Sequence, residues 1–551
     1  MRRIHEPTST DDPVGSARHT PAPVGMLGPD RNWHLGAGLM TLATAGAFTI
    51  WAFAYAGTHV NALLLVLALA FGLFMAFNIG GNDVANSFGT SVGAGTLTMK
   101  QALVVAAVFE VSGAVLAGGS VTETVRSGIV DLDQMQVDAP AFTYIMMSAL
   151  LGAAVWLLLA TRMGWPVSTT HAIIGGIVGA AVTTGLVTGT GGLAMVQWGE
   201  IGQIAISWVL SPVLGGIAAF LLFGAIKRRI LAPAARAIAL GSRGFDDGDD
   251  EDDADDPEQS RHVPGYERLT ELQQTAFAES AELDRSPGSP GAELVERAEQ
   301  LTKKQRKAAR NVERKAAYHA LEKRVPPLAA GAAVVIASML MFKGLKNVGL
   351  DITPWGGAVL LTMLAVAVWI GTRVFARALR TQTISQATFI MFSWLQVFTA
   401  CAFAFSHGAN DIANAVGPFA AVLDVLRTGT VSQEAAVPMA VLVAFGIALV
   451  SGLWFVGRKV IQTVGSGLTT MHPSSGFAAE LAAAATVLLA SVLGLPVSST
   501  HILIGAVLGV GIVNRAANWK LMRPIFLAWI ITLPAAAGIG AVAVLVMRAI
   551  F

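Results

Sequence analysis

Gly80-Gly81-Asn82-Asp83-Val84-Ala85-Asn86 is a polar stretch inside a long apolar run, and the second half of the chain repeats it as Gly408-Ala409-Asn410-Asp411-Ile412-Ala413-Asn414. Each stretch is followed by a proline and a hydroxyl cluster, Pro166-Val167-Ser168-Thr169-Thr170-His171 and Pro496-Val497-Ser498-Ser499-Thr500-His501. The spacing from the aspartate to the histidine is 88 residues (171 − 83) in the first half and 90 (501 − 411) in the second. Because a carboxylate at bilayer depth costs about 2.5–3.5 kcal/mol, we expect both aspartates to face a site. The duplication predicts a transporter built from two related halves.

The composition is that of a membrane protein. Of 551 residues, 54% are hydrophobic and only 13% are charged, and the mean hydropathy is positive. A soluble domain does not have these proportions. Apolar runs suited to about 30 Å of hydrocarbon recur at 37–55, 61–79, 102–119, 142–162, 200–225, 326–342, 355–375, 386–406, 436–456, 475–493, 495–513 and 521–547.

Several classes of protein are disfavoured by simple counts. The single Cys401 lies in an apolar run, which argues against a disulfide framework and a cysteine metal cluster. Residues 1–36 are polar and rich in proline, and the first apolar run starts too late and is too long for a cleavable signal peptide. The formal charge of +1 says little about partners.

One long polar segment interrupts the apolar runs, from Lys227 to Arg324. It opens with basic residues, continues with an acidic run from Asp246 to Asp256, and ends in a basic, helix-prone stretch that begins near Lys303. Basic residues that flank spans mark the cytoplasmic side, so we place this loop inside. The acidic run lacks the glycine and terminal glutamate of an EF-hand loop, which favours a solvated, disordered linker over a calcium site.

The basic residues then fix the predicted topology. Arg373, Arg377 and Arg380 follow two crossings after the loop, and Arg458 and Lys459 follow two crossings later, so all are expected inside. A consistent count requires re-entrant hairpins at 475–513 and at 142–187. The helices that precede the two aspartates then run in opposite directions. The predicted fold class is an all-α polytopic membrane protein with two inverted-topology repeats, discontinuous helices and re-entrant helical hairpins.

Further matched blocks support the duplication. Val111-Ser112-Gly113 matches Val450-Ser451-Gly452, and Thr124 to Gly128 matches Thr463 to Gly467, with 13 residues between equivalent positions in each half (125 − 112 and 464 − 451). Ordinary small-residue packing is the alternative interpretation. The predicted divisions are a disordered cytoplasmic N-terminus (1–36), an extra transmembrane helix (37–60), the first transport repeat (61–226), the cytoplasmic charged loop (227–325), connecting transmembrane helices (326–385) and the second transport repeat (386–551).

These motifs resemble the inorganic phosphate transporter (PiT) family of secondary carriers. The resemblance covers nearly all of 61–226 and 386–548. The first signature is similar to that of the sodium-dependent branch, with Gly81 where alanine is usual, and implies Na⁺ as the coupling ion, with H⁺ as the alternative. Glu110 and Glu480 match glutamates that the family needs for transport, which implies a coupling or gating role; an internal hydrogen-bonding role is the alternative.

The chemistry of the motifs agrees with that resemblance. A tetrahedral oxyanion needs several donors, and helix N-termini bind phosphate readily through their free N–H groups; simple helix capping is the alternative role for these hydroxyls. Carboxylate and amide oxygens are hard ligands for a cation, with helix packing as the alternative. The phosphate-binding candidates are Ser168, Thr169, Thr170, Ser498, Ser499 and Thr500, and the cation-binding candidates are Asn82, Asp83, Asn86, Asn410, Asp411 and Asn414.

The expected function is import of inorganic phosphate across the plasma membrane by a multi-pass symporter that works by alternating access. The expected partners are phosphate, the coupling cation and the lipid bilayer, with no cofactor and no nucleic acid; a homodimer is left open. A Ser/His enzyme is disfavoured because no third orienting group recurs beside His171 and His501. The rival functions are a sulfate or proton-coupled permease and an anion channel.

Overall fold

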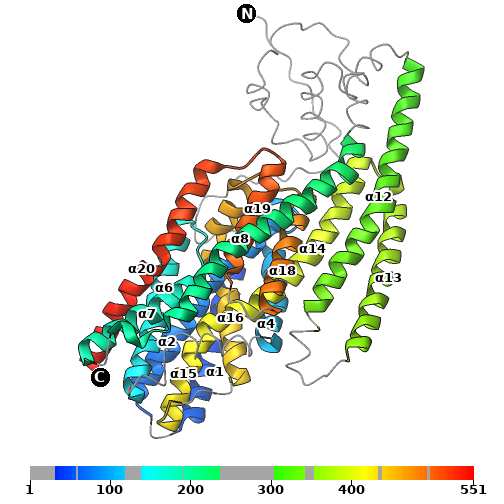
Figure 1. Ribbon diagram of the computed structural model, residues 1–551. Coiled ribbons are helices and arrows are strands. Elements are labelled where there is room, and N and C mark those ends of the chain that lie inside the picture. Colours follow the sequence, from blue (N-terminus) through cyan, green and yellow to red (C-terminus); the bar gives the residue numbers. More distant parts are fainter. Residues whose placement is uncertain are drawn as a thin grey trace, which may run out of the picture.

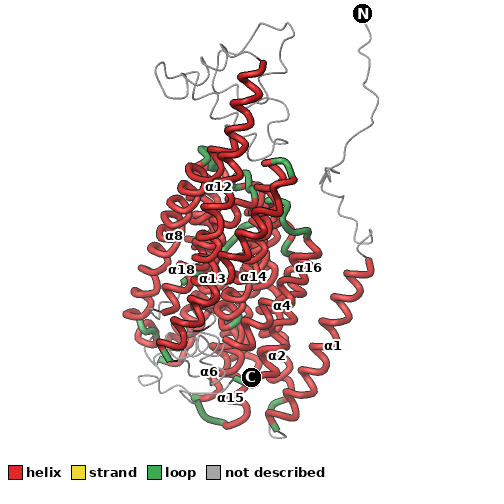
Figure 2. The backbone as a smooth tube through the Cα atoms, turned by 90° about the vertical axis from the view of Figure 1, so that its right-hand side faces the viewer, coloured by secondary structure: helices red, strands yellow, loops and turns green. Residues whose placement is uncertain are grey.

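The computed structural model describes residues 31–57, 60–117, 138–189, 192–235, 303–339, 341, 353–431, 437–492 and 497–551. This part of the chain is helical and contains no β-strand (Figure 2). Ten of its helical segments are long and apolar enough to cross a membrane. The all-helical, multi-span prediction is therefore confirmed.

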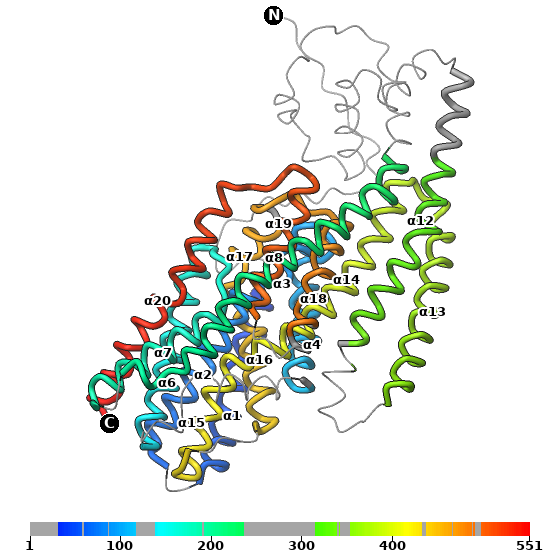
Figure 3. The backbone as a smooth tube through the Cα atoms, viewed as in Figure 1, coloured from blue at the N-terminus to red at the C-terminus, as the bar shows by residue number. Residues whose placement is uncertain are grey.

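The helices follow one another as a bundle in which the two halves of the sequence are interleaved (Figures 1 and 3). Their bounds are α1 Arg31–Ala56, α2 Ala62–Ile79, η1 Gly80–Val84, α3 Ala85–Gly93, α4 Met99–Ala117, α6 Ala139–Met163, α7 Thr169–Thr188, η2 Gly192–Met195, α8 Trp198–Ile226, η3 Lys227–Leu231, α12 Lys303–Met339, α13 Pro354–Ala378, η7 Leu379–Thr381, α14 Ile384–Asp411, α15 Ala413–Thr428, α16 Met439–Val456, α17 Arg458–Gln462, η8 Thr463–Gly467, α18 Pro473–Val492, α19 Ser499–Val513 and α20 Trp519–Ile550.

The predicted apolar runs coincide with helices, with two differences. Helix α15 was not predicted as a separate element, because its polar first turn carries the second motif and its apolar part is short. Helix α12 continues without a break through the predicted boundary at residue 325, so the basic end of the charged loop and the following apolar run form one helix. The matched block Thr124 to Gly128, the acidic run and residues 1–30 lie outside the described residues.

Two helical hairpins stand where the sequence predicted them. Helix α6 ends at Gly164, whose φ of 72° is the left-handed conformation that favours glycine, and α7 then packs back against α6. Helices α18 and α19 form the second hairpin, packed against each other in the same way. Both second helices begin after the Pro-Val-Ser sequence, with Ser168 and Ser498 as their N-caps.

Equivalent glycines let the two halves approach closely at the centre of the bundle. A Cβ atom at Gly113 would lie 2.0 Å from the carbonyl oxygen of Phe405, and one at Gly452 would lie 1.7 Å from that of Phe77. These phenylalanines each precede their motif aspartate by six residues. Helix α4 of the first half therefore packs on α14 of the second half. In the equivalent contact, α16 of the second half packs on α2 of the first half.

The hairpins make a second pair of equivalent contacts. A Cβ at Gly175 of α7 would lie 2.6 Å from the carbonyl oxygen of Leu533 in α20, and one at Gly505 of α19 would lie 2.2 Å from that of Pro212 in α8. Both glycines follow the hairpin histidine by four residues. Each hairpin is thus packed against the last long helix of the other half, and a site at the hairpin tips is made from both halves.

Candidate functional site

Both Asn-Asp motifs lie where a long helix is interrupted. In the first half the helix passes from α2 through the π-turn η1, which contains Asn82 and Asp83, into α3. In the second half α14 ends at Asp411 and α15 starts at Ala413. Local departures from α-helical geometry are frequent at functional sites, because they re-aim side chains and free backbone groups. The interruption turns both aspartates towards the hairpin tips.

Asp83 is held by hydroxyls from both hairpins. Thr169 donates a hydrogen bond of 2.6 Å to Oδ2, and Thr500 donates one of 2.5 Å to Oδ1. The aspartate is buried, with 1% of its surface exposed. Hydrogen bonds to an ionised carboxylate are stronger than those between neutral groups. Asp83 therefore links the tip of its own hairpin to the tip of the hairpin from the other half.

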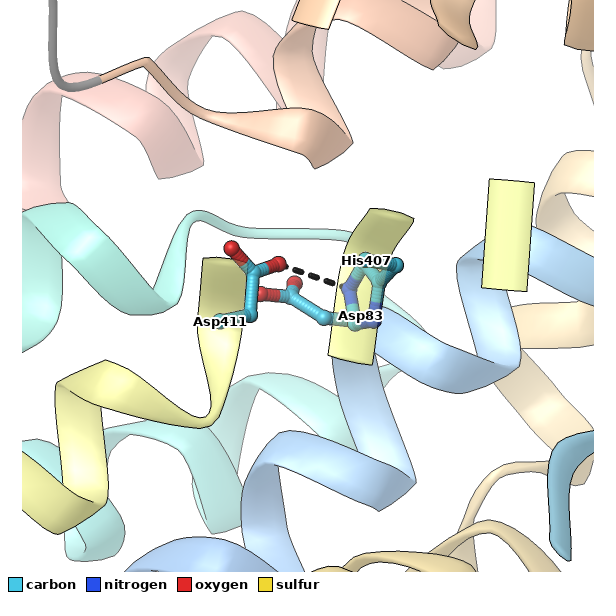
Figure 4. A group of neighbouring side chains, drawn as sticks. All are labelled: Asp83, His407 and Asp411. Carbon is cyan, nitrogen blue, oxygen red and sulfur yellow. Dashed lines mark ion pairs between the residues drawn. The ribbon is translucent and has the colours of Figure 1, made fainter. Parts of the chain in front are cut away.

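Asp411 has a different set of partners. Ser499 donates a hydrogen bond of 2.5 Å to its Oδ2, and Asn410 donates one of 2.8 Å to its Oδ1. His407, one helical turn earlier, places Nε2 2.6 Å from the same Oδ2 (Figure 4). The other ring nitrogen, Nδ1, lies 3.0 Å from Glu110 Oε2. Glu110, predicted as a coupling residue, is therefore connected to Asp411 through a buried imidazole.

The two aspartates and His407 come close enough to share an ion. Ligand atoms from Asp83, His407 and Asp411 all lie within 4.8 Å of one another, and all three side chains are buried. Figure 4 shows them converging from the two interrupted helices. Carboxylate oxygens suit hard cations, so this cluster could hold one.

Sequence reasoning did not select His407. Its signal was present: it lies four residues before Asp411 and so on the same helix face, in a position that Ile79 occupies in the first half. A polar residue that breaks the match between two otherwise similar motifs was the observation that could have found it.

The asparagines connect the motifs to the hairpins. Asn82 donates to the hydroxyl of Thr161 and to the carbonyl of Trp165, and its Oδ1 accepts from the backbone N–H of Val167. Its side chain therefore holds the turn of the first hairpin. Asn414 donates to Thr169 and Thr170 across the interface between halves. The side chain of Asn86, also a predicted ligand, lies outside the described residues.

The six predicted hydroxyls divide into two groups. Three of them donate to the aspartates: Thr169, Ser499 and Thr500. The other three accept hydrogen bonds instead. Ser168 and Ser498 accept from the N–H groups of His171 and His501, and Thr170 accepts from Asn414. Among the described residues no acceptor is found for the hydroxyl protons of these three side chains, so each can still donate one hydrogen bond.

Glu480 lies in a second buried polar cluster. Its carboxylate accepts from the hydroxyls of Thr90 (2.6 Å), Ser91 (2.5 Å) and Thr399 (2.7 Å), and from the amide of Gln396 (3.3 Å). Four donors aimed at one carboxylate are the partners of an ionised, acceptor-only group. The cluster joins α3 to α14 and α18, and the coupling or gating role of Glu480 and its internal hydrogen-bonding role both stay predictions.

The hairpin histidines are packed as aromatic rings. His171 and His501 meet edge to face with their centroids 4.5 Å apart, and they lie against Trp208 and Trp529 at 3.7 and 3.8 Å. Within the part of the chain that the structure describes, the ring nitrogens of His171 make no side-chain hydrogen bond. The hydroxyl of Ser168 bonds instead to the histidine's backbone. In both described hairpins the serine hydroxyl is therefore bonded to the histidine backbone and not to the imidazole, unlike the serine of a Ser–His pair.

Comparison with known proteins identifies the family. Residues 79–540 match the model of the phosphate transporter family. A protein of Mycobacterium bovis named as a phosphate permease is 56% identical over 97% of this chain and 96% of its own length. Inorganic phosphate transporter 2-1, a chloroplastic protein of Arabidopsis thaliana, is 34% identical over 87% of this chain and 71% of its own length.

A solved structure shares the fold. It is described as the sodium-dependent phosphate transporter, is 30% identical, covers 89% of this chain and all of its own, and superposes with a TM-score of 0.66. The family consists of transporters and permeases and is not an enzyme family. The resemblance drawn from the motifs is thereby confirmed: this chain belongs to the phosphate transporter family.

Proposed function

We propose that the chain imports inorganic phosphate across the plasma membrane by sodium symport with alternating access. The observation that carries the proposal is the meeting of two helix N-termini with two buried aspartates at the interface between the halves. The N-termini and the three hydroxyls with unused protons offer donors for an oxyanion. The aspartates repel that same oxyanion, so a cation between them favours binding of phosphate.

In this proposal the residues of the site have three different roles. Ser168, Thr170 and Ser498 donate to phosphate, and Asp83 and Asp411 hold the cation. His407, which is held by Glu110 through one ring nitrogen, positions Asp411 through the other. The solved relative described as sodium-dependent supports sodium rather than protons as the coupling ion. The interleaved packing of equivalent helices supports two inverted repeats that rock about a central site.

Uptake of radiolabelled phosphate into proteoliposomes tests this proposal. A sodium gradient at equal pH on both sides should drive accumulation, and a proton gradient without sodium should not. Excess sulfate should leave the rate unchanged. Accumulation with the proton gradient alone would contradict sodium coupling, competition by sulfate would contradict phosphate selectivity, and downhill flux without any cation would indicate a channel. Fractionation of cell membranes tests the location.

A further inference from the structure

A cavity of about 820 Å³ lies away from the proposed transport site, between the end of α8 with η3 and the middle of α12. One side of it is apolar and includes Ile226, Ile230 and Leu328. Its lining also includes Arg229, Lys323 and Arg324, and none of the described residues that line it is acidic. The volume is that of a pocket for a small molecule. We call it the α8–α12 groove.

The groove lies at the level where the apolar surface of the bundle ends. Helix α8 exposes Ile217 and Leu221, and the next basic residue, Lys227 at the start of η3, follows Leu221 by six residues. Helix α13, which packs on α12, exposes Val374 and carries the basic residue Arg377 in its last turn. The change from exposed apolar to basic side chains on both helices marks a membrane–water boundary.

The positive charge of the groove is not neutralised by the nearest acid. Glu322 is adjacent to Lys323 in sequence, but its carboxylate is bound by the guanidinium of Arg380 from η7, the short helix after α13, with one N–O distance of 2.7 Å. Arg324 donates to the backbone carbonyl of Arg229, which ties α12 to η3. Within the described residues, no salt bridge involves Arg229 or Lys323.

We propose that the α8–α12 groove binds one anionic phospholipid. Its phosphodiester would lie between Arg229 and Lys323, which come from two different helices and are both exposed. One acyl chain would lie along Ile226 and Leu328 towards the exposed apolar surface of α8. Basic pockets between helices at a membrane surface are suited to such headgroups, because charge and apolar contact act together. A free phosphate ion uses only the basic half of the groove.

Binding of phosphatidylglycerol by the purified full-length protein tests the site. The protein is placed in nanodiscs of phosphatidylcholine, and phosphatidylglycerol is titrated in while bound lipid is counted by native mass spectrometry. The double variant Arg229→Gln, Lys323→Gln should bind it roughly 25-fold more weakly, at about fivefold per basic side chain. The matched control, Arg314→Gln with Lys315→Gln, removes two exposed charges from α12 about two turns away and should bind like the unmodified protein.

Two further arms separate the lipid from other anions and from general surface attraction. Ala225→Trp fills an exposed part of the groove without changing its charge and should also weaken binding. Inorganic phosphate and glycerophosphate, which lack acyl chains, should not displace the lipid. Equal losses in both double variants, unchanged binding in Ala225→Trp, or displacement by inorganic phosphate would each overturn the proposal.

Discussion

The two Asn-Asp motifs are nearly the same in sequence, yet their aspartates have different surroundings. Asp83 accepts hydroxyls from both hairpins, Thr169 and Thr500, and so bridges the halves. Asp411 accepts a hydroxyl from its own hairpin only, and its other partners are Asn410 and His407 on its own helix. The two halves thus share a frame of matched motifs, and a few residues that differ between them give the two aspartates different partners.

The differences are concentrated at charged residues that the other half lacks. His407 lies four residues before the aspartate of the second half, and Ile79 takes that position in the first half. Glu110 lies three residues before the glycine of the matched Val-Ser-Gly block in the first half, and Leu449 takes that position in the second half. Sixteen residues before the hairpin proline stands Glu480, and Leu150 takes that position in the first half. Each acid thus occurs once. In the proposed mechanism this asymmetry lets the site bind an anion and a cation at different positions.

Neutralising the aspartates should produce the largest effect. We expect Asp83→Asn and Asp411→Asn each to lower phosphate uptake at least about 100-fold, because each hydrogen bond to a charged group contributes about 1.5–3 kcal/mol and each 1.4 kcal/mol is tenfold. Proteoliposome uptake under a sodium gradient measures this. The comparison predicts one further difference. Asp83→Asn should also lower the melting temperature, since it loosens two hairpins, and Asp411→Asn should lower it less.

The control for this pair is the protein's amount and fold after reconstitution, checked by gel filtration. Uptake at the unmodified rate in both variants would remove the aspartates from the cation site. Equal thermal losses in the two variants would show that Asp83 does not bridge the halves as the hydrogen bonds indicate.

Replacing Glu480 should destabilise the protein as well as slow it. In Glu480→Gln the new amide group would face four donors, so at least one hydrogen bond to a charged group is lost, at about 1.5–3 kcal/mol each. Thr90→Val removes a single donor and leaves the carboxylate with three. Thermal unfolding in detergent should rank the two variants in that order. A Glu480→Gln protein that is as stable as the original but does not transport would favour a dedicated gating role over an internal hydrogen-bonding role.

The close approach of the halves can be tested at equivalent glycines. A Cβ at Gly80 would lie 1.7 Å from the carbonyl oxygen of Leu449, and one at Gly408 would lie 2.2 Å from that of Glu110. Alanine at either position should cost about 1–3 kcal/mol through overpacking. Gly371→Ala is the control, because no atom lies within 4 Å of the added carbon. Similar losses at Gly80 and Gly408, with none at Gly371, are the expected pattern of melting temperatures. A loss at only one of them would contradict equivalent packing.

Most of the fold followed from the sequence, because apolar length and repeated motifs are local signals. The spans and the two hairpins were predicted from runs of residues and their spacing, whereas discontinuous helices were predicted without a position at the Asn-Asp motifs. Helix α15 was not predicted, because its first turn belongs to the polar motif and the apolar part that follows is too short to indicate a span. The continuity of α12 through residue 325 was also missed, because charge alone does not end a helix.

The site was predicted in its residue types but not in its pairings. The hydroxyl that each aspartate binds depends on how the hairpins cross. The local sequence therefore does not predict the hydrogen bond from Thr500 to Asp83 or the one from Asn414 to Thr170. The link from Glu110 to Asp411 through His407 joins α4 to α14, far apart in the chain. Such contacts require the tertiary packing that brings the halves together.

The smallest effects are expected from the hydroxyls, and they decide which of them bind phosphate. Thr170 has an unused proton, whereas Thr169 donates its proton to Asp83. Thr170→Val should therefore raise the half-saturating phosphate concentration about tenfold or more, the value of one hydrogen bond to a charged group. Thr169→Val should instead raise the half-saturating sodium concentration, because it changes the partners of an aspartate. Two adjacent threonines on one helix, differing by a single methyl-for-hydroxyl change each, are matched controls for one another. If Thr169→Val acted on phosphate and Thr170→Val on sodium, the assignment of anion and cation to the two groups of hydroxyls would have to be exchanged.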